Sequence, residues 1–146
     1  MKKIAVMLLL SLSDMAFAQS YACERFIKKG IEETTKINRH IAKSNQSLDE
    51  GKALVGHNAD IKTLCEKGVE TRMNFVITAI QVHKNIDTWR SGYILCDDSD
   101  DDEAKESKET AEALFKSYLD YVRRFDKDLG TECKSAPLAP ILESLD

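Results

Sequence analysis

The segment 96–109, CDDSDDDEAKESKE, holds the densest group of side chains in this sequence that could bind a cation or a basic partner. Eight carboxylates and two lysines fall within the thirteen residues after the cysteine. Five of the carboxylates have the spacing of positions 1, 3, 5, 9 and 12 of a calcium-binding loop, whose oxygens wrap around a hard cation. These five are Asp98, Asp100, Asp102, Glu106 and Glu109.

Two positions of the segment do not fit such a loop. Position 6 is Glu103, where the loop needs a glycine for its sharp turn, and position 8 is Lys105, where it carries an aliphatic residue. We therefore expect no specific metal site and interpret the segment as a solvated acidic loop. Its last carboxylates favour the N-terminus of the next helix through the helix dipole. Calcium or cation binding by residues 98–109 is the alternative.

The other polar residues form no pattern typical of a catalytic or cofactor site. His83 and Asp87 lie four residues apart and would share a helix face, but two ligands do not complete a metal site. There is no HExxH motif, no phosphate-binding loop, no Gly-x-Ser-x-Gly elbow and no cysteine–histidine pair at a family spacing. We therefore predict that the protein is not an enzyme and uses no cofactor.

Aromatic residues just before the acidic segment indicate a protein-binding surface. In one interpretation Trp89 and Tyr93 close the end of a helical bundle. In the other they are partly exposed beside an acidic rim, where aromatic rings provide burial and charge provides steering. The second interpretation makes residues 87–109 the candidate surface. Its predicted partner-binding residues are Trp89, Tyr93, Asp97, Asp98, Asp100, Asp101, Asp102 and Glu103.

The N-terminus has the pattern of a bacterial secretory signal. Lys2 and Lys3 precede an apolar run over residues 4–12, and Ala16-Phe17-Ala18 supplies the small-x-small cleavage pattern. The apolar run of about nine residues is far shorter than the ~20 that a spanning helix needs. We expect cleavage after residue 18, export to the periplasm, and a single helical domain over residues 19–146 with no membrane span.

The acidity of the chain is local. Removal of the predicted signal takes away two lysines and one aspartate, which leaves 19 basic and 24 acidic groups and a net charge of −5. Residues 97–109 alone contribute −6. Such a field steers basic partners or binds cations, and it argues against nucleic acid or anionic lipid as a ligand.

The spacing of apolar residues predicts an all-α fold. Steps of three and four residues recur over 22–46, 60–90 and 111–130, which is the period of an amphipathic helix. The capping-box pattern at 47–50 predicts a separate short helix over 47–56, and Ser91-Gly92 is expected to end the third helix. Pro137 and Pro140 favour the first turn of a short closing helix. The prediction is a compact bundle of three long and two short helices.

Four cysteines in an exported chain predict two disulfides. Cys65 and Cys96 would lie at opposite ends of one helix, roughly 40 Å or more apart, whereas disulfide-bonded Cα atoms lie within about 7 Å. An up-down-up arrangement favours Cys23 with Cys96 and Cys65 with Cys133. If the short helix carried the chain back across the bundle, Cys23 would pair with Cys65 and Cys96 with Cys133.

Parts of the chain resemble the small periplasmic immunity proteins that protect bacteria from cell-wall-degrading effectors of the type VI secretion system. The resemblance rests on LCEKG, SGYILCDD and AEALFKSYLDYV, where an aromatic-x-x-Cys step leads through a loop into a helix with the pair Tyr118-Leu119. It implies an exported, disulfide-bonded helical domain that binds a toxic enzyme.

These observations lead to one preferred hypothesis and two alternatives. The preferred hypothesis is a periplasmic inhibitor or immunity protein that binds one protein partner, a basic secreted hydrolase, through the acidic loop. The alternatives are a calcium- or cation-binding envelope protein and a periplasmic chaperone. A homodimer is compatible with all three hypotheses.

Overall fold

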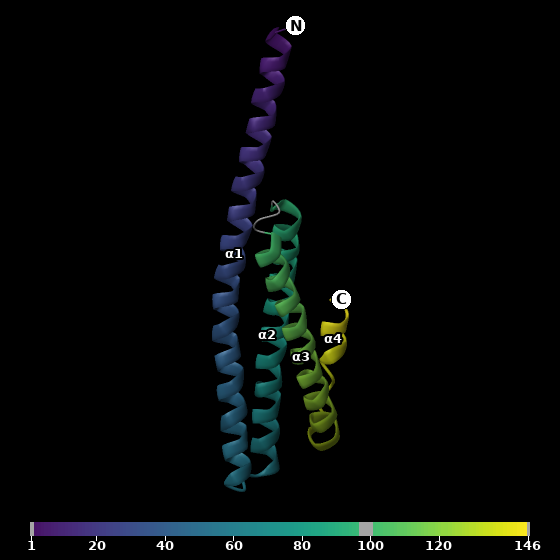
Figure 1. The fold of residues 1–146 in the computed structure, drawn as a ribbon. Helices are drawn as coiled ribbons and strands as arrows, with labels where there is room; N and C mark the ends of the chain where they lie inside the picture. Colours follow the sequence, from purple (N-terminus) through teal and green to yellow (C-terminus); the bar gives the residue numbers. More distant parts are fainter. Residues whose placement is uncertain (1, 97–100, 146) are drawn as a thin grey trace.

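A computed structural model describes residues 2–96 and 101–145, with side chains for 21–96, 102 and 104–145. These residues form four helices and no strand: α1 (Lys2–Gly56), α2 (Ile61–Leu95), α3 (Asp101–Cys133) and α4 (Ala139–Glu143). The three long helices run in alternating directions, and the N-terminal part of α1 projects beyond the others (Figure 1). The predicted all-α bundle is confirmed, whereas the signal peptide over residues 1–18 stays a prediction.

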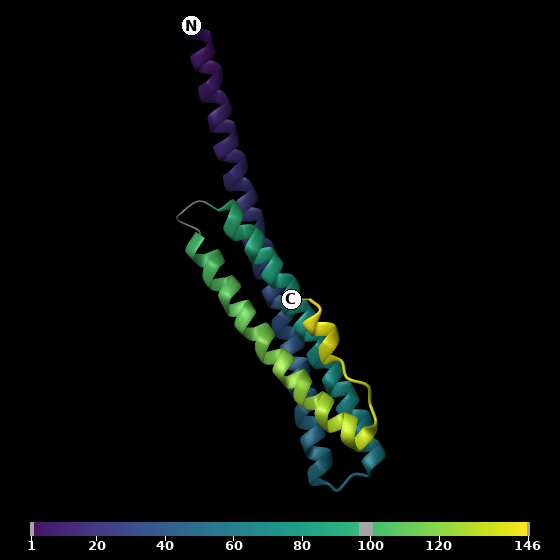
Figure 2. The same ribbon diagram turned by 90° about the vertical axis from the view of Figure 1, so that its right-hand side faces the viewer.

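Helix α2 lies at the centre of the bundle. Helices α1 and α3 each pack along it, and α4 lies against α2 and α3 (Figure 2). Within the described part of the chain, no helix combines the length and the apolarity that crossing a membrane requires.

The apolar core is built mainly by α2 and α3. Phe75 of α2 is 3% exposed, and its ring lies 5.3 to 5.4 Å from the rings of Tyr118, Tyr121 and Phe125 on α3. Burial raises the pKa of the Tyr118 hydroxyl. Among its residues with described side chains, α1 contributes Ile37 to the cluster of buried apolar residues, and its partly buried Ile41 and Leu48 pack against this cluster. Apolar spacing therefore indicated the core face correctly on α3, where Phe115, Tyr118 and Val122 are buried, and poorly on α2, where Val69 and Met73 are exposed.

The contact between α1 and α2 is largely polar. Two hydroxyl pairs cross it, Ser44 with Thr78 at 3.0 Å and Ser47 with Thr71 at 2.8 Å, and all four side chains are buried. A buried hydroxyl needs a hydrogen-bond partner, so these pairs also restrict how α1 can slide along α2.

The prediction of a separate short helix over residues 47–56 was wrong, because α1 continues without a break to Gly56. The two residues of the expected capping box contact α2 instead of capping a helix. Ser47 bonds to Thr71, and Glu50 pairs with Lys67. A local cap contributes about 1 kcal/mol, and here tertiary contacts to α2 replace it. The bundle therefore has three long helices and one short helix.

The ends of α2 and α3 also differ from the prediction. Gly92 does not end α2 but is buried within it, where an added Cβ would lie 3.5 Å from Phe26 and 4.0 Å from Ala104. Helix α3 begins at Asp101 rather than near residue 111, because acidic residues stabilise a helix N-terminus. It continues past Gly130 to Cys133, and Lys134 then takes the left-handed conformation that often ends helices.

The preferred disulfide pairing is confirmed. Cys23 bonds to Cys96, and Cys65 bonds to Cys133. The first bond ties α1 to the end of α2 where the chain passes toward α3. The second ties the start of α2 to the end of α3. The two cross-links therefore fasten α2 at both ends, each to a different neighbour.

A buried ion pair positions the short helix α4. Arg72 of α2 donates hydrogen bonds to Asp126 of α3 at 2.7 Å, to the Ala136 carbonyl and to the Ser135 hydroxyl. Asp126 also accepts the backbone N–H groups that begin α4, those of Leu138 and Ala139. Of the two prolines expected in the first turn, Pro140 lies there and Pro137 precedes α4.

We predict that Arg72→Met lowers the free energy of unfolding by about 3 kcal/mol, because it leaves the Asp126 carboxylate buried without its cation. Urea unfolding followed by circular dichroism measures the loss. Arg90, whose side chain is 58% exposed, gives the matched control. Arg90→Met should change the free energy by less than about 0.5 kcal/mol. If both variants lose the same free energy of unfolding, the buried pair of Arg72 and Asp126 contributes no more to stability than an exposed arginine.

We also predict that α1 is the least protected part of the bundle once its disulfide is removed. In the double variant Cys23→Ala with Cys96→Ala, amide protons of residues 21–56 should exchange faster, while those of α2 and α3 keep their protection. The reason is that, in the described residues, α1 contributes fewer buried residues to the apolar core than α2 or α3 does. Hydrogen exchange measured by mass spectrometry tests this.

The matched control removes the other cross-link, with Cys65→Ala and Cys133→Ala. This variant should not accelerate exchange selectively in α1. A uniform rise in exchange across all three long helices after loss of Cys23 and Cys96 would show that the bundle opens as one unit.

Candidate partner-binding surface

The end of α2 presents two large side chains to solvent. Tyr93 is 41% exposed and Ile94 is 70% exposed. Both precede Cys96, which leaves the helix in an extended conformation while its N–H still bonds to the Gly92 carbonyl. The disulfide to Cys23 then fixes this point on α1. The two exposed side chains are therefore held on a rigid part of the bundle.

The acidic residues predicted for the surface lie at or before the start of α3. Asp97, Asp98 and Asp100 fall outside the described residues. The backbone of Asp101 and Glu103 belongs to the first turn of α3, and their side chains are outside the description. Asp102 is exposed in the same turn. The start of α3 lies close to the end of α2. A Cβ built on Gly92 of α2 would lie 4.0 Å from the Cβ of Ala104 on α3.

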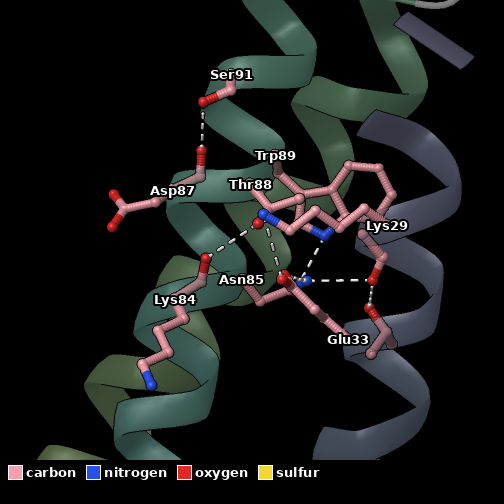
Figure 3. A network of polar contacts seen from close by, with 10 residues as sticks. Lys29, Glu33, Lys84, Asn85, Asp87, Thr88, Trp89 and Ser91 are labelled. Atoms are coloured by element: carbon pink, nitrogen blue, oxygen red, sulfur yellow. Dashed lines mark hydrogen bonds and ion pairs between the residues drawn. The ribbon is translucent and has the colours of Figure 1, made fainter. Parts of the chain in front are cut away.

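Trp89 does not belong to the exposed surface, which corrects its assignment as a contact residue. Its side chain is only 3% exposed and points from α2 toward α1 (Figure 3). The indole N–H donates to the Asn85 side-chain oxygen at 3.0 Å, and the Asn85 amide donates to the Gly30 carbonyl and to Glu33. The interpretation that Trp89 and Tyr93 close the end of the bundle therefore holds for Trp89 and not for Tyr93, which is 41% exposed.

Gly30 makes this packing possible. A Cβ built on Gly30 would lie 2.5 Å from the Trp89 ring, closer than any real contact allows. The glycine therefore allows α1 to approach the indole face directly. Trp89 and Asn85 together fix the position of α1 beneath the surface that Tyr93 and Ile94 present.

The sequence interpretation missed one exposed aromatic residue near this end of the bundle. Tyr21 is 65% exposed and lies two residues before Cys23. The disulfide brings Cys23 to within 4.8 Å of Cys96, measured between the Cα atoms. The proximity of Tyr21 to this cysteine was the available signal, but it becomes meaningful only once the pairing is known.

The calcium-loop alternative does not fit the backbone. A loop of that kind must curve around the ion and turn sharply at its sixth position. Residues 101–109, which would be positions 4–12, are helical instead. In a helix the carboxylates of Asp102, Glu106 and Glu109 follow one another along the axis and do not encircle a cation.

The remaining candidate ligands form no metal site in the described residues, where no group of three or more His, Cys, Asp or Glu side chains could hold an ion. His83 and Asp87 share a face as predicted, with 4.0 Å between Nδ1 and the carboxylate. The His83 ring also packs 5.4 Å from the ring of Phe115. His83 is thus engaged by its neighbours on α2 and α3.

One hollow lies between α1 and α3 just below this end. Its volume is about 310 Å³, and Asn85 and Trp89 contribute to its floor. The rim consists mostly of hydroxyl and amide side chains, among them Thr34, Asn38 and Thr110, with Glu106 as the one carboxylate in the lining.

Comparisons with known proteins leave the surface to be judged on its own geometry. No family model, curated protein or solved structure matches this chain.

We predict that Gly30→Ala destabilises the protein by about 1 to 3 kcal/mol, because the new methyl group overlaps the Trp89 ring. Urea unfolding gives the free energy, and Trp89 fluorescence reports whether the indole becomes exposed to water. Gly56→Ala is the matched control, since a Cβ there meets no atom within 4 Å. If both variants unfold at the same urea concentration, the contact between Gly30 and Trp89 is not a tight constraint.

Proposed function

We propose that this protein is an exported periplasmic inhibitor, of the immunity-protein type, that binds and blocks one toxic enzyme. The observation that carries the proposal is the exposure of Tyr93 and Ile94 on a disulfide-fixed helix end directly beside an acidic run. We name the surface formed by Tyr93, Ile94 and Asp102, next to which the acidic run lies in the sequence, the acidic-end surface.

Rigidity supports this role. A binding surface that is already ordered loses little conformational entropy when the partner binds, which favours high affinity. The Cys23–Cys96 disulfide and the buried Trp89 hold the acidic-end surface from two sides. The two disulfides also fit an oxidising compartment such as the periplasm.

Composition supports a basic partner. Exposed aromatic and aliphatic side chains supply the desolvated centre of an interface, and a charged rim accelerates association with a partner of opposite charge. Residues 97–103 carry six carboxylates and no basic residue. A cell-wall hydrolase with a positive surface is the class of enzyme that this arrangement fits best. The proposal assigns binding and no catalysis to the chain.

The partner is sought by capturing proteins from native envelope extract, and products of neighbouring genes, on the oxidised protein at low and at high salt. The proposal expects one enzyme that is retained at low salt, weakened at high salt, and inhibited by stoichiometric amounts of the protein. Retention without inhibition of any activity would contradict the inhibitor role.

With the partner in hand, we predict that Tyr93→Ala combined with Ile94→Ser weakens binding about 30-fold or more, because the pair forms the apolar centre of the interface. Isothermal titration calorimetry measures the affinity. Tyr121→Ala removes a tyrosine of similar exposure, 46%, from the middle of α3 and should leave the affinity unchanged. Similar losses from both sites would place the interface elsewhere.

Neutralising the carboxylates of residues 97–103 tests the contribution of charge to partner binding separately from that of the shape of the surface. Replacement by Asn, Gln and Ser should slow association and flatten its salt dependence, because steering depends on the field of this segment. The control neutralises Asp128 and Glu132 near the other end of α3. If cells that produce the neutralised variant are still protected from the toxic enzyme, residues 97–103 do not contribute to its inhibition.

A further inference from the structure

The outer face of α2 carries an exposed apolar stripe that no other helix covers. Val69, Met73 and Ile77 follow at steps of four and are 37%, 43% and 37% exposed. The opposite faces of α2 pack against α1 and α3, so this stripe is the part of the central helix that faces solvent. We name it the outer stripe.

Helix α4 adds two further apolar side chains beside the outer stripe. Ile141 is 53% and Leu145 is 37% exposed, whereas Leu142 between them is fully buried. Glu143 turns toward α3, where it pairs with Arg123. Helical spacing therefore places Ile141 on the side of α4 away from Glu143, and Leu145 lies in the turn that follows the helix. Figure 2 shows α4 lying alongside α2.

The position of α4 is strongly enforced. The buried pair of Arg72 and Asp126 holds the first residues of α4 through several hydrogen bonds. A short helix held this firmly presents its exposed side chains as a fixed surface. The five exposed side chains of α2 and α4 amount to on the order of 400 Å² of apolar surface, the size of patch that marks an interaction site.

The charges at the two ends of the outer stripe select a partner. Lys62 and Glu66 precede Met73 on the same face of α2 by 11 and 7 residues, and Lys84 and Asp87 follow Ile77 by 7 and 10 residues. All four side chains are exposed. If a second α2 packs antiparallel with its Ile77 against Met73, Glu66 lies opposite Lys84, and Lys62 lies opposite Thr88, one residue beyond Asp87.

In a parallel arrangement each of these residues would meet its own copy, which places like charges opposite each other. Like charges across an interface cost free energy, whereas opposite charges set register and orientation. The antiparallel register around Met73 and Ile77 is thus the one that packs these two apolar residues together and places Glu66 opposite Lys84.

We propose that the outer stripe and α4 form the interface of a two-fold symmetric homodimer in which two copies of α2 pack antiparallel at about 20°. A stable dimer buries about 800 Å² per partner. The apolar patch supplies about half of that area, and the flanking charged residues supply the rim. This inference does not depend on the proposed function, because its residues are distinct from those of the acidic-end surface.

Sedimentation equilibrium of the exported, oxidised protein tests the dimer. The wild-type protein should be dimeric at micromolar concentration. Met73→Glu should raise the dimer dissociation constant about 100-fold or more, because two carboxylates are forced toward the two-fold axis. Ile31→Glu places the same charge on an apolar residue of α1 that is 52% exposed, and it should leave the dimer intact. Circular dichroism confirms that both variants remain folded.

A charge exchange tests the register. Glu66→Lys alone should weaken the dimer because it faces Lys84 of the second copy, and adding Lys84→Glu to it should restore the dimer. A wild-type protein that is monomeric at 100 micromolar, a scale of weak association, overturns the proposal. A dimer that Met73→Glu leaves intact also overturns it, as does a dimer that the double charge exchange fails to restore.

Discussion

The position of every other helix depends on its packing against α2. Helix α2 is in contact with α1, α3 and α4, which pack on three of its sides. Its contact with α3 is apolar and aromatic, centred on Phe75, and supplies most of the burial that stabilises the fold. Its contact with α1 carries buried hydroxyl pairs, which contribute to alignment more than to stability.

Unequal contacts explain why the two disulfides have different tasks. Between α2 and α3 a large core already resists separation, and the Cys65–Cys133 bond closes a structure that apolar packing has formed. Between α1 and α2 the buried hydroxyl pairs lie on one part of the contact and the Trp89 indole on another, and the Cys23–Cys96 bond ties the two helices at the end next to Trp89. The same bond fixes the end of α2, so stability of α1 and order of the acidic-end surface have a common physical origin.

The two surfaces that we assign to binding differ in chemistry. The acidic-end surface combines a few exposed apolar side chains with a strong local field, which suits a partner of opposite charge. The outer stripe is apolar, with balanced charges at its ends, which suits a copy of itself. Buried side chains position both surfaces: Trp89 and Asn85 support the first, and Arg72 and Asp126 support the second.

The sequence by itself determined the helical class and the approximate span of the long helices, because apolar periodicity and helix length are local properties. It excluded a Cys65–Cys96 bond and favoured the observed disulfide pairing, but left one alternative that the structure decided. It placed Tyr93 and the acidic run side by side, since they are neighbours along the chain. Only the tertiary structure decided that Ser47 bonds across to α2 instead of capping a helix and that Gly92 is a packing position. It also decided that Trp89 is buried while Ile94 is exposed. These outcomes depend on which helix lies opposite each residue, and contacts between residues 24 to 73 positions apart leave no mark in local spacing.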